Sequence, residues 1–452
     1  MSSGPYTRFV AGVAFPLQEW LRGHSSASAL RELERSQWLS RAELERLRVS
    51  RLRGLLGHAR DRVPYYRSLF ERHRFDPDRV ESPGDLARLP LLTKDVIRAS
   101  FADLEARGAK RMRLFSTTGS TGDPLRFLIG KPRFSRDIAA KWRATRWWGL
   151  DIGDREFVAW SSPIELTAQD RFRRARDFVL RSKLFPAIAL TAERLDAFVA
   201  GIRAFRPRML FGYPSSLTLA AQHARSKGIG MADLGIEVAF VTAERLYPHQ
   251  RAEISTVFGC RVADGYGGRD SGFLSHECPE GGMHITAEDV ILEIVDGEGR
   301  PLPAGEAGDV VVTHLFSHEF PFIRYKTGDV AVLDDRSCPC GRGLPLLREI
   351  QGRTNDFLVA ESGARVHDVA FAMVLRDTPG VEQFKIVQET IERTRLQLVV
   401  GPGFDRARSL EPIERTFRVH LGAKVRVDVE FVPRIEPERT GKYRYVVSRV
   451  AT

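Results

Sequence analysis

The stretch RMLFGYPSSLTLAAQHARSKG, residues 208–228, joins a short apolar run to a helical pattern. The run RMLFGY has the length and apolar character of a buried strand. The residues after it have the composition of a helix, which we expect to begin at a serine cap and to end at Gly228. A strand followed directly by a helix is the repeating unit of α/β proteins.

The same alternation extends over residues 150–330. The runs IEVAFVTAE (236–244) and CRVADGYG (260–267) also predict buried strands. Strands that alternate with helices predict a parallel or mixed sheet. From residue 288 the pattern changes to strand-period alternation with Gly, Pro and Asp turns, in DVILEIVDGEGRPLPAGEAGDVVVTHL. This pattern predicts an antiparallel β unit.

The two ends of the chain have patterns of their own. Residues 26–75 carry apolar side chains three and four positions apart, which predicts helices, and Thr93 is placed as a helix cap. Near the C-terminus, strand-like runs alternate with helical segments. We therefore expect an α/β protein with a large N-terminal domain (1–354) of mixed or parallel sheets with helices plus a β subdomain, preceded by a helical extension (1–50). A small mobile α+β C-terminal lid domain (355–452) should follow.

The composition is that of a globular protein of 452 residues with a formal net charge of +11. Arginine is spread along the chain without a block of like charges, and zinc-finger, RNP and basic-zipper patterns are missing. Nucleic acid is therefore not the expected partner, whereas the charge suits anionic small molecules such as nucleotides. The chain has no apolar run of membrane-spanning length, and its apolar start is broken by Pro16 and lacks a cleavage site. We expect a cytoplasmic enzyme.

The four cysteines lie in the same third of the chain, at Cys260, Cys278, Cys338 and Cys340. So few, clustered cysteines favour an intracellular metal site over a disulfide framework. Cys278, Cys338 and Cys340 together with His284 offer the ligand set of a structural zinc site. The Cys-x-Cys spacing is tighter than the usual Cys-x2-Cys, so free buried thiols stay open as the alternative. His276 is a competing ligand, and Cys260 is expected in the core.

The stretch FSTTGSTGDP, residues 115–124, suits a phosphate. It combines five hydroxyl side chains with two glycines. Glycines let backbone N–H groups converge on an anion, and hydroxyls donate further hydrogen bonds. It is not a Walker loop, because neither Lys-Ser nor Lys-Thr follows the second glycine. On composition alone, a flexible surface linker is the alternative.

Four later stretches place charged or aromatic side chains in glycine turns: VADGYGGRDSG (262–272), RYKTGDV (324–330), GRTND (352–356) and RTGK (439–442). We expect Asp264, Tyr266 and Asp270 in a turn after a strand, and Asp329 in a turn before one. Each stretch alone is a common surface turn, and only their order along the chain is distinctive.

In this order the motifs resemble those of the adenylate-forming ligase superfamily, within its phenylacetate–coenzyme A ligase and CapK-like branch. The resemblance runs from about residue 55 to the end, and it includes VPYYRSLF (63–70) and LPLLTKD (89–95). It implies ATP- and Mg²⁺-dependent activation of a carboxylic acid to an acyl-adenylate, followed by transfer to a thiol, with coenzyme A expected. Another acceptor, a stable adenylate, or a homologue that has lost catalysis stays open, as does a homodimer.

The resemblance also implies roles for the motif residues. Lys442 would stabilise the negative charge that develops as pyrophosphate leaves, and Asp356 would be the hinge of the C-terminal domain. The β- and γ-phosphates would be held by Thr117, Thr118, Gly119, Ser120, Thr121 and Gly122. Adenine and ribose would be lined by Thr242, Ala243, Glu244, Asp264, Gly265, Tyr266, Gly267, Asp329 and Arg353. An aryl or short apolar acid would be bound by Phe211, Gly212, Tyr213, Pro214, Ser215 and Val241.

One run departs from the family pattern. The family usually has Tyr-Gly, a variable residue, Ser or Thr, and then Glu, whereas this chain has Tyr266, Gly267, Gly268, Arg269 and Asp270. Asp270 would be the Mg²⁺ carboxylate, one methylene shorter than Glu. Arg269 replaces a hydroxyl beside the α-phosphate, and it can pair with that phosphate or with a second acidic group of the substrate. The departure leaves room for a weak or non-standard activity.

Overall fold

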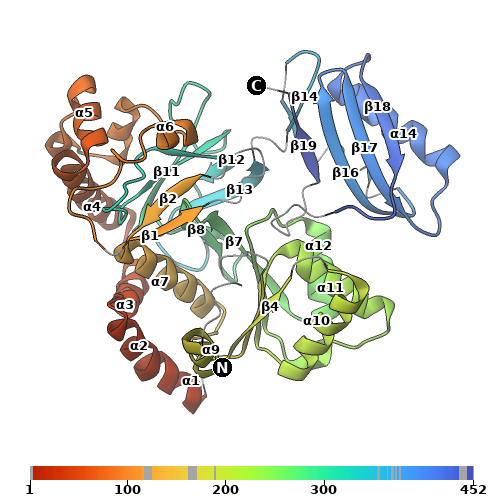
Figure 1. Cartoon of the computed structure of the whole chain (residues 1–452), viewed down its shortest axis with the longest axis horizontal. Coiled ribbons are helices and arrows are strands. Elements are labelled where there is room, and N and C mark those ends of the chain that lie inside the picture. The colour runs from red at the N-terminus through yellow and green to blue at the C-terminus, as the bar shows by residue number, and fades with distance from the viewer. Residues whose placement is uncertain are drawn as a thin grey trace. The chain divides into compact units, whose positions relative to one another are not determined.

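The computed structural model describes residues 4–110, 112–116, 125–160, 171–187, 190–353, 357–363, 365–367, 371, 374–375, 378–436 and 445–450. The chain divides into two compact units, Met1–Ile350 and Gln351–Thr452, which are described separately (Figure 1). The expected boundary between residues 354 and 355 stays a prediction.

One mixed sheet forms the centre of the first unit (Figure 1). Within the described residues it has eleven strands in the order β10-β11-β12-β13-β9-β8-β7-β6-β5-β3-β4. They are β3 (Glu156–Trp160), β4 (Ser182–Pro186), β5 (Met209–Gly212), β6 (Val238–Thr242), β7 (Arg261–Gly268), β8 (Gly272–Glu277), β9 (Met283–Ile285), β10 (Val290–Val295), β11 (Ala307–His314), β12 (Tyr325–Asp334) and β13 (Leu346–Arg353). β4, β3, β5, β6 and β7 pair in parallel, whereas β7 pairs with β8 antiparallel. The antiparallel unit expected from residue 288 therefore continues the α/β sheet.

The parallel strands are connected by α10 (Ala192–Phe205), α11 (Pro214–Ser226) and α12 (Pro248–Phe258). Side chains from these helices, including Ile202, Leu217 and Ile254, pack in one buried cluster with the strands. The serine cap expected for α11 is wrong. The helix begins at Pro214, after Tyr213 at the cap position, because the fixed φ of proline suits the first helical turn. Gly228, with φ of 65°, follows the last helical residue by two positions.

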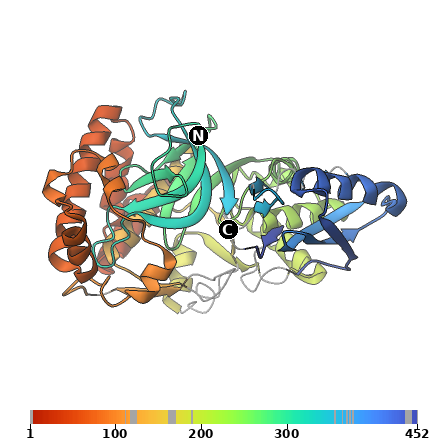
Figure 2. The same ribbon diagram turned by 90° about the horizontal axis from the view of Figure 1, so that it is seen from above.

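The region predicted to be helical before residue 75 is helical, and its helices gather on one side of the sheet (Figure 2). Thr93 caps α6 as expected, because its Oγ1 accepts a hydrogen bond from the backbone N of Val96 at 3.3 Å. The elements before β3 are α1 (Pro5–Phe9), η1 (Val10–Ala14), α2 (Phe15–Leu21), α3 (Ser26–Ser36), α4 (Arg41–Arg62), α5 (Pro64–His73), η2 (Pro77–Arg79), η3 (Pro83–Arg88), α6 (Lys94–Ala99), β1 (Arg113–Ser116), β2 (Arg126–Ile129) and α7 (Lys131–Trp147). Two short helices follow later, α9 (Arg171–Val179) and η4 (Ala232–Leu234).

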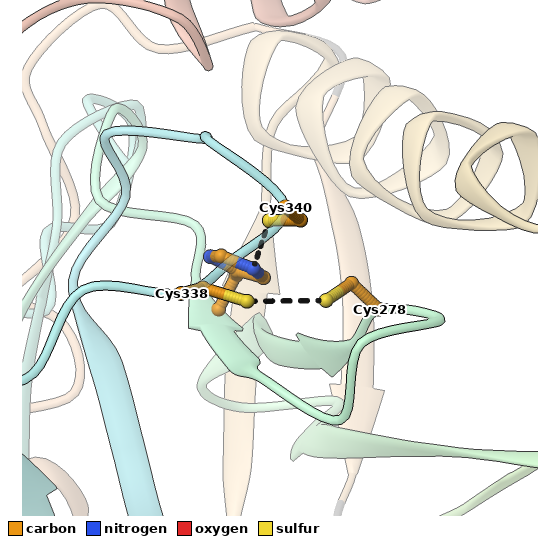
Figure 3. A group of neighbouring side chains, drawn as sticks. Cys278, Cys338 and Cys340 are labelled. Carbon is orange, nitrogen blue, oxygen red and sulfur yellow. Dashed lines mark hydrogen bonds between the residues drawn. The ribbon is translucent and has the colours of Figure 1, made fainter.

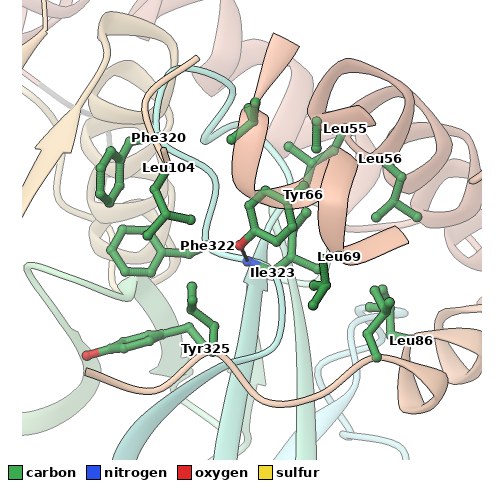
Figure 4. Packing of buried hydrophobic residues seen from close by; sticks show 14 of the residues in the cluster. Leu55, Leu56, Tyr66, Leu69, Leu86, Leu104, Phe320, Phe322, Ile323 and Tyr325 are labelled. Carbon is green, nitrogen blue, oxygen red and sulfur yellow. Dashed lines mark hydrogen bonds between the residues drawn. The ribbon is translucent and has the colours of Figure 1, made fainter. Parts of the chain in front are cut away.

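A buried cluster joins α4 and α5 to the segment that leads into β12 (Figure 4). The hydroxyl of Tyr66 donates to the carbonyl of Pro321 at 3.0 Å and accepts from the backbone N of Ile323 at 3.2 Å. The ring of Tyr325 belongs to the same cluster, which includes Leu55 and Phe322. This core therefore fixes the first residue of β12.

The second unit is a small α+β fold. Its four-stranded sheet has the order β18-β17-β16-β19, and the hydrophobic side of α14 packs on it through Ile413 and Phe417. The elements are β14 (Phe357–Val359), β15 (Arg365–His367), β16 (Val381–Thr390), β17 (Arg393–Val400), α14 (Arg406–Leu421), β18 (Arg426–Phe431) and β19 (Val446–Ser448). The expected fold class, a large mixed α/β sheet and a small C-terminal domain, is confirmed.

No helix in the described part of the chain combines the length and the apolar character that crossing a bilayer requires.

Candidate functional site

Strand β7 carries two of the predicted nucleotide-binding side chains. The strand expected over residues 260–267 is confirmed, and Asp264 and Tyr266 lie inside it, so the turn position that was also expected for them is wrong. Asp270 lies in the turn after the strand, as expected. The glycines of this run allow close strand pairing. A Cβ at Gly267 would overlap the carbonyl oxygen of Gly272 on β8.

Asp329 also lies inside a strand, and the expected turn before the strand is wrong. The register between β11 and β12 shifts at Asp309 and Val311, and Gly328 has φ of 88°. A bulge of this kind re-aims the side chain beside it. As a result, Asp329 Oδ2 accepts a hydrogen bond from the hydroxyl of Tyr266 at 2.8 Å.

This hydrogen bond joins β7 and β12, two strands that are not neighbours in the sheet. Burial first, and then the negative charge of Asp329, raise the pKa of Tyr266 well above its ordinary value. The hydroxyl therefore stays protonated and acts as a donor to the carboxylate. The structure thus brings together the residues expected at adenine and at ribose.

Hydrogen bonds from two side chains, Tyr325 and Arg133, fix the turn after β7. The hydroxyl of Tyr325 donates to Asp270 Oδ2 at 2.6 Å. The buried guanidinium of Arg133, on α7, donates to the backbone carbonyls of Arg269 at 3.0 Å and of Asp270 at 2.5 Å. Arg133 and Tyr325 were not predicted. Tyr325 stood inside the quoted RYKTGDV motif, whereas nothing distinguished Arg133 from the many other arginines of the chain.

Arg269 lies beside the start of the predicted phosphate loop. Its guanidinium carbon is 5.7 Å from the ring centroid of Phe115, on β1. β1 and β2 pair antiparallel, with Ser116 opposite Arg126, so the loop connects the two strands of a hairpin. The loop residues Thr117, Thr118, Gly119, Ser120, Thr121 and Gly122 themselves lie outside the described residues.

The carboxyl group of Asp264 is a weaker acid than usual. Burial, and then the charge of Glu277, raise its pKa to about 7. Glu277 is held close by, because its Oε2 accepts from the backbone N of Asp264 and from Arg251 Nη2, both at 2.8 Å. A ligand that donates a hydrogen bond to Asp264, as an amino group does, would favour its ionised form.

The segment after β6 links the predicted adenine and acyl residues. Thr242 ends β6, and Ala243 has φ of 70°, a left-handed conformation that is uncommon for a residue with a side chain. The next residue, Glu244, accepts a hydrogen bond from the backbone N of Ser215 through Oε2 at 3.2 Å. The residues predicted to bind adenine and those predicted to bind the acid therefore meet at the ends of β5 and β6.

The predicted acyl residues are largely packed in the core. Phe211 and Tyr213 stack on Trp160, with ring centroids 5.9 and 4.5 Å apart. Gly212 is needed for packing, since a Cβ there would lie 2.6 Å from the carbonyl oxygen of Ala159. Val241 and Pro214 are buried. Ser215 Oγ is buried without a hydrogen-bond partner among the described residues.

The remaining predicted residues have no described side chains. Arg353 is the last residue of β13, and its backbone alone is described. Asp356 and Lys442 lie outside the described residues.

The structure brings together the four predicted metal ligands. The ligand atoms of Cys278, His284, Cys338 and Cys340 all lie within 4.8 Å of one another. The Sγ atoms of Cys278 and Cys338 are 3.6 Å apart, and Cys340 Sγ is 3.2 Å from His284 Nε2 (Figure 3). Burial lowers the pKa of His284 to about 4, so its imidazole is neutral, as a metal ligand must be. Three thiols and one imidazole at these distances fit a tetrahedral zinc ion.

The other two residues considered with this cluster in the sequence have different surroundings. His276 is not part of the four-residue group, and its ring stacks on Phe273 with centroids 5.2 Å apart. Cys260 lies in the core, in one buried cluster with side chains of β6 and α12, where burial raises its pKa to about 12. It is a core residue, as expected.

We expect zinc in the purified protein, at about one ion per chain, and a loss of nearly all of it in Cys338→Ser, because a closed site needs all four ligands. Metal analysis by mass spectrometry measures this. Cys260→Ala is the matched control and should keep the ion. A wild-type protein that takes up no zinc when the ion is supplied during refolding would contradict the assignment.

Comparison with known proteins gives consistent matches. Residues 358–449 match the family model described as the CapK C-terminal domain. The phenylacetate-coenzyme A ligase of Thermus thermophilus is 28% identical over 403 residues, which cover 84% of this chain and 88% of the relative. Protein CapK of Staphylococcus aureus is 22% identical over 424 residues, 90% of each chain. A crystal structure of 2-hydroxyisobutyryl-CoA ligase in the postadenylation state with 2-HIB-AMP has a TM-score of 0.76 at 23% identity, covering 92% of this chain and 91% of that chain. This last likeness shows the fold.

Proposed function

Because this chain belongs to the adenylate-forming superfamily, within its phenylacetate–coenzyme A ligase and CapK-like branch, we propose that it is an AMP-forming acid–thiol ligase. The observation that supports this best is the hydrogen bond of Tyr266 to Asp329 between β7 and β12. It places an aromatic ring and a carboxylate together, as an adenosine site requires.

The nucleotide would be held in three places. The ring of Tyr266 would stack on adenine, and Asp329 would accept hydrogen bonds from the ribose hydroxyls, because a carboxylate has enough lone pairs for a vicinal diol. The phosphates would lie between the 117–122 loop and Arg269, whose place beside Phe115 supports this. Asp270, oriented by Tyr325, would be the protein's ligand to a Mg²⁺ ion, which prefers oxygen ligands.

The reaction would have two steps. A carboxylate oxygen of the acid attacks the α-phosphorus of ATP, and the bond to pyrophosphate breaks, which gives an acyl-adenylate. The sulfur of coenzyme A then attacks the acyl carbon, loses its proton, and displaces AMP. Lys442 would stabilise the charge that develops in the first step. We further propose that the C-terminal unit turns about Asp356 between the steps, which would exclude water from the adenylate.

The acid would bind at the ends of β5 and β6. The rings of Phe211 and Tyr213 support an aryl or short apolar acid. The buried Ser215 Oγ, which has no hydrogen-bond partner in the described structure, supports a polar group on that acid. Burial of an unpaired hydroxyl costs free energy that a ligand oxygen would recover.

Pyrophosphate release tests the proposal. The protein is incubated with Mg·ATP and a panel of aryl, aliphatic and amino acids, with and without coenzyme A. Release with one class of acid, increased by coenzyme A, is the expected result and names the substrate class. Mass spectrometry of the product identifies the thioester. The absence of release with any acid, while ATP still binds, would refute the proposed activity.

The departure from the family pattern at Arg269 and Asp270 supports a second candidate, an adenylating enzyme with a different acceptor. The shorter carboxylate and the added positive charge alter the surroundings of the α-phosphate. Pyrophosphate release that does not respond to coenzyme A would favour an amide, an ester or a stable adenylate as product. A homologue that has lost catalysis would bind ATP but release no pyrophosphate.

We expect Asp329→Ala to raise the KM for ATP by about 10- to 100-fold, because hydrogen bonds to a charged group contribute roughly 1.5 to 3 kcal/mol each. Tyr266→Phe is the matched variant. It removes the hydroxyl that orients Asp329 but keeps the ring that would stack on adenine, so its effect should be smaller. Steady-state kinetics at saturating acid measures both. An equal or larger effect of Tyr266→Phe would show that the assignment of the ribose contact to Asp329 is wrong.

A further inference from the structure

The N-terminal helical segment exposes a row of large apolar side chains. Residues 5–21 are helical throughout, with the π-helical turn η1 just before Pro16. The exposed side chains are spaced three and four residues apart, which places them on one face. They are Tyr6 (37% exposed), Phe9 (57%), Val13 (51%), Leu17 (53%), Trp20 (72%) and Leu21 (71%).

The opposite face of this segment is apolar as well. Val10 and Phe15 are buried in one cluster with Leu30 and Leu33 of α3. The only acidic residue of the segment, Glu19, is buried, and it accepts hydrogen bonds from Ser26 and His24. The segment is therefore firmly attached to the body of the unit. A helix that is apolar on both faces is normally covered on both.

Helix α9 continues the exposed face. α1 lies beside α9 (Figure 1), and the Tyr6 hydroxyl donates to the carbonyl of Val179 at 2.9 Å. Phe178, at 83% exposed, and Val179 add apolar surface next to the ring of Tyr6. We call Tyr6, Phe9, Val13, Leu17, Trp20, Leu21, Phe178 and Val179 the apolar face. Contiguous apolar surface of this kind marks an interaction site.

The charges around the apolar face are almost all positive. Arg8 and Arg22 are exposed on the first segment, and the guanidinium of Arg181 lies 3.7 Å from the ring centroid of Tyr6. Residues 175–183, whose side chains the structure describes, contain three basic residues and one acid, Asp177, which is paired with Arg176. A symmetric contact with a second copy would bring these positive charges together with little acid to pair them. An anionic surface complements them.

We propose that the apolar face docks in the plane of a bilayer that contains anionic phospholipids. Helices that lie in a membrane interface combine Trp, Phe and Leu on one side with Arg or Lys at the border. Phospholipid headgroups would contact Arg8, Arg22 and Arg181, while Phe9, Trp20 and Phe178 would enter the acyl boundary. This inference is independent of the proposed reaction.

Vesicle flotation tests the proposal with the full-length protein. One set of vesicles contains phosphatidylcholine alone, and the other contains phosphatidylcholine with phosphatidylglycerol. We expect binding to the anionic vesicles, and we expect it to fall as salt is added, because surface attraction is screened. Phe9→Ser/Trp20→Ser should weaken the partition by at least ~10-fold, since burial of each side chain is lost. Arg8→Glu/Arg22→Glu should weaken it by at least ~30-fold.

Matched controls lie on other surfaces of the chain. Val419→Ser removes an exposed apolar side chain from α14, and Arg72→Glu reverses an exposed charge on α5. Both should float like the wild type, and all variants should keep the wild-type thermal midpoint. Failure of the wild type to bind either vesicle would overturn the proposal. So would an oligomer in solution that Phe9→Ser/Trp20→Ser dissociates, because the face would then be an interface between copies.

Discussion

Replacement of Lys442 by alanine is expected to slow pyrophosphate release by about 100- to 1,000-fold, the usual cost of removing one group that stabilises transition-state charge. The amine would neutralise charge only while pyrophosphate leaves. The second step, attack of a thiol on an adenylate, would not need it. A supplied acyl-adenylate should therefore be converted to thioester at close to the wild-type rate.

Two variants sharpen this test. Lys424→Ala removes an exposed lysine from the same C-terminal unit and should leave both steps unchanged. Lys442→Arg keeps the charge but replaces a compact ammonium by a planar fork, so we expect partial activity. Equal losses in both steps would show that Lys442 acts on folding or on domain position. An unchanged first step would remove it from the catalytic assignment.

Replacement of Glu288 by alanine is expected to destabilise the first unit by about 3 to 5 kcal/mol. Glu288 and Arg143 are 0% and 1% exposed, and Oε1 lies 2.6 Å from Nη1. Ser36 of α3 donates to the same Oε1 at 2.8 Å. Removal of the carboxylate would leave a buried guanidinium without its charge partner. All six tryptophans lie in the first unit, so the urea midpoint measured by tryptophan fluorescence reports this change.

The matched controls separate burial from charge. Glu298→Ala breaks an ion pair with Arg300 in which both side chains are mostly exposed, and it should leave the midpoint unchanged. The double variant Arg143→Met/Glu288→Leu removes both charges and should recover much of the loss. A Glu288→Ala midpoint equal to that of the wild type would show that the pair contributes little to the stability of this fold.

The fold class could be predicted because its signals are local. Short apolar runs such as residues 209–212 and 238–242 identified the strands, and the pattern after residue 355 identified the small domain. The extent of the sheet could not be predicted. Whether β8 pairs with β7 and closes the parallel and antiparallel parts into one sheet depends on contacts between distant segments. The run 260–267 was predicted both as a strand and as part of a glycine turn, and only the strand is confirmed, because close strand pairing needs glycine as well.

The site shows the same division. The positions of Tyr266, Asp270 and Asp329 in the sequence pointed to a nucleotide site, but their pairing with one another and with Tyr325 did not follow from it. Arg133 and Arg143 are buried arginines whose hydrogen-bond partners lie more than a hundred residues away. The spread of arginine along the chain suggested a surface property. In the structure, some of these arginines form buried contacts that hold the helices to the sheet.

The cysteine cluster has a consequence for the unfolded chain. Its ligands come from the end of β8, from β9 and from the segment after β12, so the four strands β9, β10, β11 and β12 lie between the first ligand and the last. An ion bound to Cys278 and Cys340 closes a loop of about 60 residues, and a cross-link of that size removes roughly 4 kcal/mol of conformational entropy from an unfolded chain that carries it. Zinc bound early would therefore act as a folding template, because β10, β11 and β12 would search for their register within a closed loop.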